Sequence, residues 1–91
     1  MSENSTSEKP LRRPEITSYQ VGDELVLYDD RNQTAISLNY TAAAVWELCS
    51  GEFTVDTIIA MIDSMYGSDD EVIDSEILQT IDRFRSLDLL V

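Results

Sequence analysis

The amino-acid sequence predicts an α+β domain in which three β-strands precede three α-helices. Apolar residues alternate in short runs between residues 15 and 39, and from Asn39 to the C-terminus they recur every three or four positions. The chain of 91 residues suffices for one modest hydrophobic core and is too short for two. Because the strands come before the helices in one small chain, we expect the helices to pack on one face of a small sheet.

Three short segments have the two-residue period of β-strands. The first, "EITSYQVG" (15–22), is rich in β-branched residues and is followed by turn formers. The second, "ELVLYDD" (24–30), alternates its apolar residues and then stops at a polar turn. The third, "QTAISLN" (33–39), places its larger aliphatic residues on one face. The connections are short, so the strands are predicted to form an antiparallel meander.

The first two helices have clear start and stop signals. Asn39 can accept a hydrogen bond from an amide of the first turn, three alanines follow, and Gly51 can adopt the left-handed conformation that ends a helix. The second helix begins after the cap residue Thr54, has the clearest apolar stripe in the chain and ends at Gly67. Both segments are therefore predicted to be amphipathic helices.

The third helix opens with Ser68 and Glu71, which have the spacing of a capping box. An apolar tail, "LDLLV" (87–91), closes the chain and must either dock or remain exposed. The apolar positions of the helix recur at intervals of four, four and three: Ile73, Ile77, Ile81 and Phe84.

Residues 1–13 are predicted to form a flexible arm and residues 14–91 the folded domain, because the arm lacks periodic apolar positions. The chain has a net charge of −12, and the part from Pro14 onward has three arginines and sixteen acids. Such a surface repels phosphate backbones and favours a basic or apolar partner. The sequence shows neither a secretion signal nor a membrane span, so we expect a cytoplasmic location.

The sequence contains no recognisable catalytic or metal-binding constellation. It has no His and a single Cys, so nitrogen and sulfur ligands for a metal cannot be assembled within the chain. Carboxylates in a small acidic protein are typically solvated surface groups. Trp46 and Cys49 are predicted to be core residues, since free Cys is commonly buried and no His or Lys lies near it in sequence. We therefore expect neither enzyme activity nor a cofactor.

Two blocks of the sequence resemble the PqqD family. "LNYTAAAVWELCSGEFTVDTIIAMIDSMYG" (38–67) is similar to the family's core motif of Leu-Asn, small residues, an aliphatic-aromatic pair, Leu, Gly, Thr and an apolar second helix. "EILQTIDRFRSLDLLV" (76–91) is similar to its closing helix with a terminal apolar run. The resemblance covers about residues 15–91. It departs at Asp88, where the family usually has Gly, but Asp tolerates the left-handed conformation and the turn can survive.

The resemblance implies a RiPP recognition element, a winged-helix-like domain that binds the leader of a ribosomally made precursor peptide. Family members are non-catalytic peptide chaperones that present this leader to a modifying enzyme, often a radical SAM enzyme. They serve the biosynthesis of pyrroloquinoline quinone (PQQ), lasso peptides or other modified peptides. In the family the leader adds as a further strand beside the third strand, in the groove between that strand and the third helix.

The resemblance maps the peptide-binding site onto one strand and one helix of this chain. An open strand edge has unpaired amides and carbonyls with which an extended peptide can pair, and the same edge can drive formation of a homodimer. The residues expected on the helix could equally belong to the core alone. The expected strand residues are Gln33, Thr34, Ala35, Ile36, Ser37 and Leu38. The expected helix residues are Ile73, Glu76, Ile77, Thr80, Arg83 and Phe84.

Two other functions are conceivable for a small acidic domain of this fold. A winged-helix transcriptional regulator would need a basic recognition helix, but residues 68–91 hold seven acids against Arg83 and Arg85. A small acidic carrier protein would carry pantetheine on a Ser in an Asp-Ser-Leu context, which Asp74-Ser75-Glu76 only partly imitates. We therefore expect a peptide-binding adaptor that binds no nucleic acid and no membrane.

Overall fold

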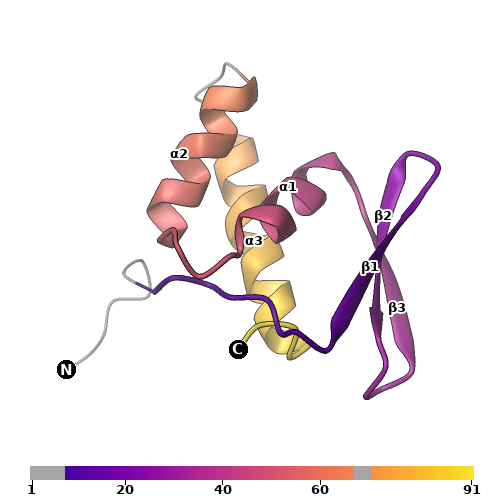
Figure 1. The fold of residues 1–91 in the computed structure, drawn as a ribbon. Helices are drawn as coiled ribbons and strands as arrows, with labels where there is room; N and C mark the ends of the chain where they lie inside the picture. Colours follow the sequence, from indigo (N-terminus) through magenta and orange to yellow (C-terminus); the bar gives the residue numbers. More distant parts are fainter. Residues whose placement is uncertain (1–7, 67–70) are drawn as a thin grey trace.

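The computed structural model describes residues 8–66 and 71–91 and has the predicted order of three strands followed by three helices. The strands form one antiparallel sheet in the order β1-β2-β3, and the helices lie to one side of it (Figure 1). The predicted α+β fold class is confirmed. The elements are β1 (Ile16–Val21), β2 (Glu24–Asp29), β3 (Thr34–Leu38), α1 (Tyr40–Leu48), α2 (Val55–Tyr66) and α3 (Glu71–Ser86).

A two-residue turn joins β1 to β2 and fixes the register between them. Gly22 in this turn has a φ of 60°, which residues with a side chain rarely adopt, and Val21 pairs with Glu24 across the turn. A four-residue turn joins β2 to β3, and its last residue, Gln33, has a φ of 56°. Among the described strands, β3 pairs only with β2, so its other side is an open edge of the sheet.

The N-terminal caps of the first two helices are confirmed. Asn39 Oδ1 accepts a hydrogen bond from the amide of Ala42 at 2.9 Å, and Thr54 Oγ1 accepts one from the amide of Thr57 at 3.2 Å. Each side chain therefore satisfies one of the amides that the first turn of its helix leaves unpaired. The predicted capping box of α3 begins at Ser68, which lies outside the described residues, as does Gly67.

The C-terminal end of α1 differs from the prediction. The helix ends at Leu48 and is capped by Cys49, whose amide donates to the carbonyl of Trp46 at 3.2 Å. Gly51 has the predicted left-handed φ, at 84°, but lies beyond the end of the helix. The last carbonyls of α1 are instead bound by Arg12, whose Nη1 donates to the carbonyls of Trp46 and Glu47 at 2.8 Å each.

These contacts correct the prediction of a flexible arm over residues 1–13 at its C-terminal part. Two isolated bridges pair Leu11 with Ser50 and Arg12 with Leu90. The amide of Val91 also donates to the carbonyl of Leu11 at 2.8 Å, so the two ends of the described chain lie side by side (Figure 1). The segment has no apolar periodicity because it docks mainly through backbone hydrogen bonds, which leave no mark on side-chain pattern.

The C-terminus of α3 ends in a Schellman motif with Asp88 in the left-handed position, at φ 60°. The amide of Leu89 donates to the carbonyl of Phe84 at 2.9 Å, and the amide of Asp88 donates to the carbonyl of Arg85 at 3.0 Å. The prediction that Asp can replace the usual Gly here is confirmed. The motif turns the apolar tail back under the helix, where Leu89 and Leu90 are buried.

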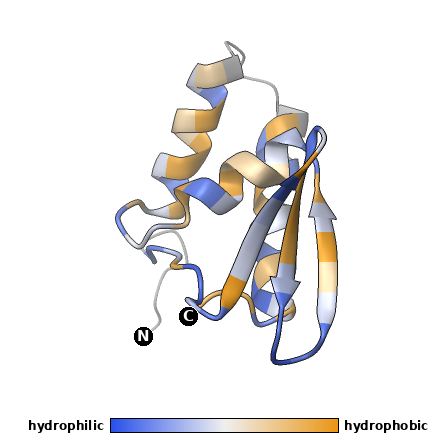
Figure 2. Ribbon diagram, turned by 45° about the vertical axis from the view of Figure 1, so that its right-hand side comes forward, coloured by the Kyte–Doolittle hydropathy of each residue, from blue (hydrophilic) through white to orange (hydrophobic). Residues whose placement is uncertain are grey.

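One hydrophobic core joins the helices to the sheet. Trp46 of α1 and Phe84 of α3 are both buried and meet edge to face, with ring centroids 5.2 Å apart, a contact that contributes roughly 0.5–1.5 kcal/mol beyond area burial. Cys49 is fully buried, so its predicted structural role is confirmed. Apolar and polar residues alternate around α2 in Figure 2, and its Ile58 and Ile62 are fully buried. No helix in the described ranges is long and apolar enough to cross a membrane.

Candidate functional site

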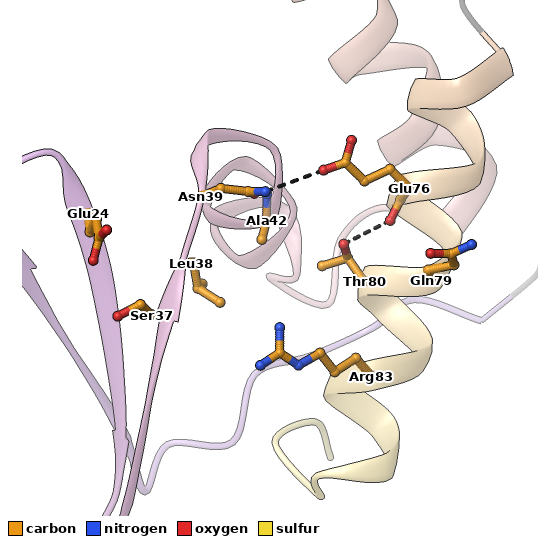
Figure 3. Close-up of a pocket in the computed structure, with 9 residues that line it drawn as sticks. All are labelled: Glu24, Ser37, Leu38, Asn39, Ala42, Glu76, Gln79, Thr80 and Arg83. Carbon is orange, nitrogen blue, oxygen red and sulfur yellow. Dashed lines mark hydrogen bonds between the residues drawn. The ribbon is translucent and has the colours of Figure 1, made fainter.

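A groove runs between the open edge of β3 and the facing side of α3, and we call it the β3–α3 groove. It consists of two hollows that follow one another along both elements. The Arg83 hollow, of about 450 Å³, is lined by Glu24, Ser37, Leu38, Asn39, Ala42, Glu76, Gln79, Thr80 and Arg83 (Figure 3). The Leu87 hollow, of about 570 Å³, is lined by Leu27, Asp29, Asn32, Thr34, Ala35, Ile36, Ser86, Leu87, Asp88 and Leu89.

Helix α1 holds the two walls of the groove in place. It packs against β3 on one side and against α3 on the other. The Asn39 cap that starts α1 also donates from Nδ2 to Glu76 of α3 at 3.4 Å, a weak bond that spans the top of the groove (Figure 3). The two walls, β3 and α3, have opposite chain directions. Residues 34–36 of β3 face the C-terminal end of α3, whereas residues 37–38 face its middle.

The register of the sheet decides which backbone groups point toward the groove. In a hairpin with a two-residue turn the flanking pair, here Val21 and Glu24, exchanges hydrogen bonds, and every second pair along the ladder does the same. The alternate residues of β2 therefore turn toward β3, and they pair with Thr34, Ile36 and Leu38. The amides and carbonyls of Ala35 and Ser37 consequently point to the open edge. These two residues give the edge two donors and two acceptors for an added strand.

The side chains of β3 divide between the two faces of the sheet. Ile36 is half-buried and Leu38 is buried, whereas Ala35 and Ser37 are exposed. Figure 3 shows Leu38 pointing toward α3 and Ser37 pointing away from it. A strand added at this edge would have the same two-residue period, so every second side chain of it would face α3.

The Leu87 hollow has an apolar interior with acidic groups at its rim. Leu87 is 41% exposed although it is a large aliphatic residue, and it lies opposite Ala35 and Ile36. Leu27 and Leu89 are buried at the base of the hollow. An apolar side chain placed here would cover surface that is otherwise in contact with water, which favours binding by about 25 cal/mol per Å².

The acids at this rim are bound by arginines. Asp29 is buried; its Oδ1 accepts from Nε of Arg31 and its Oδ2 from Nη2, both at 2.9 Å, while Asn32 Nδ2 donates to Oδ2 at 2.9 Å. The hydrogen bonds from Arg31 and Asn32 outweigh burial and lower the pKa of Asp29 to about 2. The two parallel hydrogen bonds between Arg31 and Asp29 fix the turn that leads into β3.

A second set of ion pairs ties the N-terminal segment and this turn to the end of α3. Asp88 binds Arg13 through Oδ1 at 2.8 Å and Arg31 through Oδ2 at 3.3 Å. Its carbonyl also accepts from both guanidinium groups, at 3.0 and 2.7 Å. The two arginines offset the unfavourable placement of a carboxylate at a helix C-terminus. The pairs are exposed, so their contribution is mainly to position, with little effect on stability.

The predicted site residues fall into three groups in the structure. Thr34, Ala35, Ile36, Ser37, Leu38, Glu76, Thr80 and Arg83 line the groove. Gln33 lies in the turn before β3, and Ile73 is a half-buried residue packed on the core. Ile77 and Phe84 are completely buried, and their assignment to the groove is corrected because they have no surface to offer a ligand.

Several residues that line the groove were missed by the sequence analysis. Gln79 and Ser86 are polar and lie on the exposed side of α3, where the sequence carries no signal of function. Leu87 and Leu89 belong to the apolar tail, for which the sequence analysis left open whether it docks or remains exposed. Asn39 was identified only as a helix cap, yet it also lies at the top of the groove. Asn39 directly follows β3 in the sequence, whereas the other four residues are brought beside the strand only by the tertiary structure.

The described residues provide neither a reactive thiol nor a cluster of metal ligands near the groove. Burial raises the pKa of the Cys49 thiol to about 11, which leaves it protonated at neutral pH. The described residues contain no group of three His, Cys, Asp or Glu side chains that could hold a metal ion. The groove offers backbone pairing along β3, one apolar hollow, and a second hollow that has one guanidinium group and the carboxylates of Glu24 and Glu76.

The fold and groove define a small α+β domain with an open strand edge facing a helix, an arrangement that accepts an extended chain. The chain belongs to the PqqD family: the model for Coenzyme PQQ synthesis protein D matches residues 24–90. No curated protein sequence matches it.

Two solved structures have a similar fold. One is described as TbiB1 in complex with the TbiA(beta) leader peptide; it is 19% identical, with a TM-score of 0.74, and the match covers 88% of this chain and 93% of that one. The other is described as lasso peptide synthetase B1 complexed with the leader peptide; it is 20% identical, with a TM-score of 0.76, and the match covers 91% of this chain and 98% of that one. At these identities the likeness establishes the shared fold.

Proposed function

We propose that this protein is a non-catalytic adaptor that binds the leader of a ribosomally made precursor peptide and presents it to a modifying enzyme. The observation that carries the proposal is the open edge of β3 beside the two hollows of the groove. Backbone pairing at Ala35 and Ser37 would supply affinity in a manner that tolerates many sequences, and the hollows would supply selectivity. Membership of the PqqD family and the leader-bound state of the two similar structures support this assignment.

The groove residues have distinct roles in this proposal. Thr34, Ile36 and Leu38 keep β3 attached to β2, so that the edge is a rigid template. Leu87 and Ile36 would contact an apolar side chain of the leader, while Glu76, Thr80 and Arg83 would face the neighbouring part of the leader. The modifying enzyme then receives a leader held in one extended conformation, which lowers the entropic cost of bringing the rest of the precursor to its active site.

Calorimetry with a synthetic leader tests the proposal. Any short open reading frame beside the gene for this protein supplies the probe, as a synthetic peptide of its N-terminal half. We expect a dissociation constant of roughly tens of micromolar or tighter. In a titration followed by amide NMR, the signals of Ala35 and Ser37 should shift, whereas those of the opposite edge, such as Ser18 in β1, should not. Absence of binding at these concentrations, or shifts confined to β1, would contradict the proposal.

A further inference from the structure

Arg83 differs from the other arginines in that its guanidinium group has no partner among residues 8–66 and 71–91. Within the described residues, its guanidinium group makes no hydrogen bond or ion pair. The remaining arginines are all bound by the protein: Arg12 to carbonyls of α1, Arg13 to Asp88, Arg31 to Asp29 and Asp88, and Arg85 to Glu8. Among the described residues Lys9 also makes no such contact, but it lies at a different hollow, beside Pro10 and Val91. What distinguishes Arg83 is that it is unpaired and lines the β3–α3 groove.

The position of Arg83 in the groove explains why its guanidinium group is left unpaired. It is the only basic residue among those that line either hollow of the β3–α3 groove. Figure 3 shows its side chain reaching from α3 toward β3, near Leu38. Glu76 and Glu24 line the same hollow, but neither forms an ion pair with it in the described part of the chain. The guanidinium group therefore faces the space that an added strand would occupy.

The period of a β-strand relates this position to the Leu87 hollow. Ile36 lies at the Leu87 hollow and Leu38 at the Arg83 hollow, two residues apart on the same face of β3. A strand added to the edge repeats this spacing, so a side chain opposite Ile36 and one opposite Leu38 are also two residues apart. The first meets an apolar surface, and the second meets the guanidinium group.

We propose that Arg83 is a specificity-determining residue that selects peptides with an Asp or Glu two residues away from an aliphatic or aromatic side chain. The inference rests on the proposed peptide-binding function and adds the chemical pattern of the peptide. The distant charges of this acidic protein oppose it little, since the Debye length is about 8 Å at physiological salt. Glu24 and Glu76 line the same hollow and repel a further carboxylate, so the preference depends on direct contact with the guanidinium group. The planar fork of Arg matches a carboxylate in two-point geometry.

Selection from a displayed library of random dodecapeptides tests the pattern and does not require the sequence of the leader. The wild type, Arg83→Glu and Arg85→Glu are used as baits. Arg85 is a matched control because it lies in the same last turn of α3 but pairs with Glu8, away from both hollows. We expect the wild type and Arg85→Glu to enrich peptides with an acid two residues from an apolar residue. Arg83→Glu should enrich Lys or Arg at that acidic position.

Calorimetry with an enriched peptide then measures the contact. Changing its acid to the neutral amide should weaken binding to the wild type about three- to fivefold, the effect of a partly exposed ion pair. The same change should have no effect on binding to Arg83→Gln and the full effect on binding to Arg85→Gln. Circular dichroism establishes that each variant is folded, as expected for changes at exposed positions.

The outcomes separate the two proposals. If peptides are enriched and lose binding with Ser37→Pro, but show no acid preference or the same preference with Arg83→Glu, the role of Arg83 is refuted while the peptide-binding function stands. If the wild type enriches no peptide above background, both proposals are refuted together. Enrichment of the acid-apolar pattern that switches to a basic residue with Arg83→Glu supports both.

Discussion

Replacing Ser37 with proline should weaken peptide binding while the protein stays folded. Proline lacks an amide N–H, and the Ser37 amide points to the open edge of β3, so no hydrogen bond within the sheet is lost. Ser18→Pro in β1 is the matched control. By the same register argument the amide of Ser18 points away from β2, at the opposite edge of the sheet, and both serines are exposed.

The expected magnitude follows from one lost hydrogen bond. A backbone hydrogen bond contributes roughly 1 kcal/mol net, which corresponds to about a fivefold rise in the dissociation constant. The proline ring also occupies the space of the amide hydrogen and displaces the facing carbonyl of the peptide. A fivefold rise in the dissociation constant is therefore the lower limit of the expected effect. Ser18→Pro should leave the dissociation constant unchanged.

Calorimetry against the leader peptide measures affinity, and urea unfolding measures stability in parallel. Ile36→Pro provides a further comparison, because the amide of Ile36 pairs with Leu27 inside the sheet. That variant should lose much of its stability as well as its binding. A folded Ser37→Pro protein with wild-type affinity, or a loss of affinity in Ser18→Pro, would refute the reasoning that peptide adds at β3.

Three further predictions concern stability and reactivity. Asp88→Ala should lower the free energy of unfolding by about 1 kcal/mol, because Ala is strained at φ 60°, whereas Asp88→Gly should be close to neutral. Urea unfolding measures both variants, and equal losses of stability would contradict this view of the turn. The pKa of Asp29 is lowered to about 2 from 3.8, so its contribution to stability is complete above about pH 4 and is lost as the pH falls toward 2. The melting temperature of Asp29→Asn should therefore drop less than that of the wild type over this pH range. An identical drop would refute the prediction. Cys49, whose pKa is raised to about 11, should resist iodoacetamide at pH 8 until the protein is unfolded in urea; rapid alkylation of folded protein would contradict its burial.

The local signals in the sequence determined most of the fold. Asn39 and Thr54 cap their helices as predicted because a side-chain cap depends on residues only three positions apart. Asp88 takes the left-handed position for the same reason, since its conformational tolerance belongs to the residue itself. The change of apolar period at Asn39 placed the boundary between sheet and helices. In each case the physical cause acts over a few residues and leaves a readable pattern.

The resemblance to the PqqD family indicated the strand and the helix that form the groove, but the sequence left the faces of α3 unassigned. Ile77 and Phe84 share the apolar stripe with positions that an amphipathic helix could use either for a core or for a ligand. The structure assigns them to the core and gives the groove to Thr80 and Arg83, which lie beside that stripe. Periodicity identifies a face, but not what covers it.

Only the tertiary structure decided how distant segments meet. Arg12 binds the end of α1, and Arg13 joins Arg31 at Asp88, across separations of more than thirty residues that no local pattern records. The apolar tail returns to the base of the groove for the same reason, since burial is non-directional and is satisfied wherever space remains. The sequence therefore determined the elements and their order, because these depend on neighbouring residues. The shape of the groove and the position of Arg83 in it came from packing, which depends on all of them together.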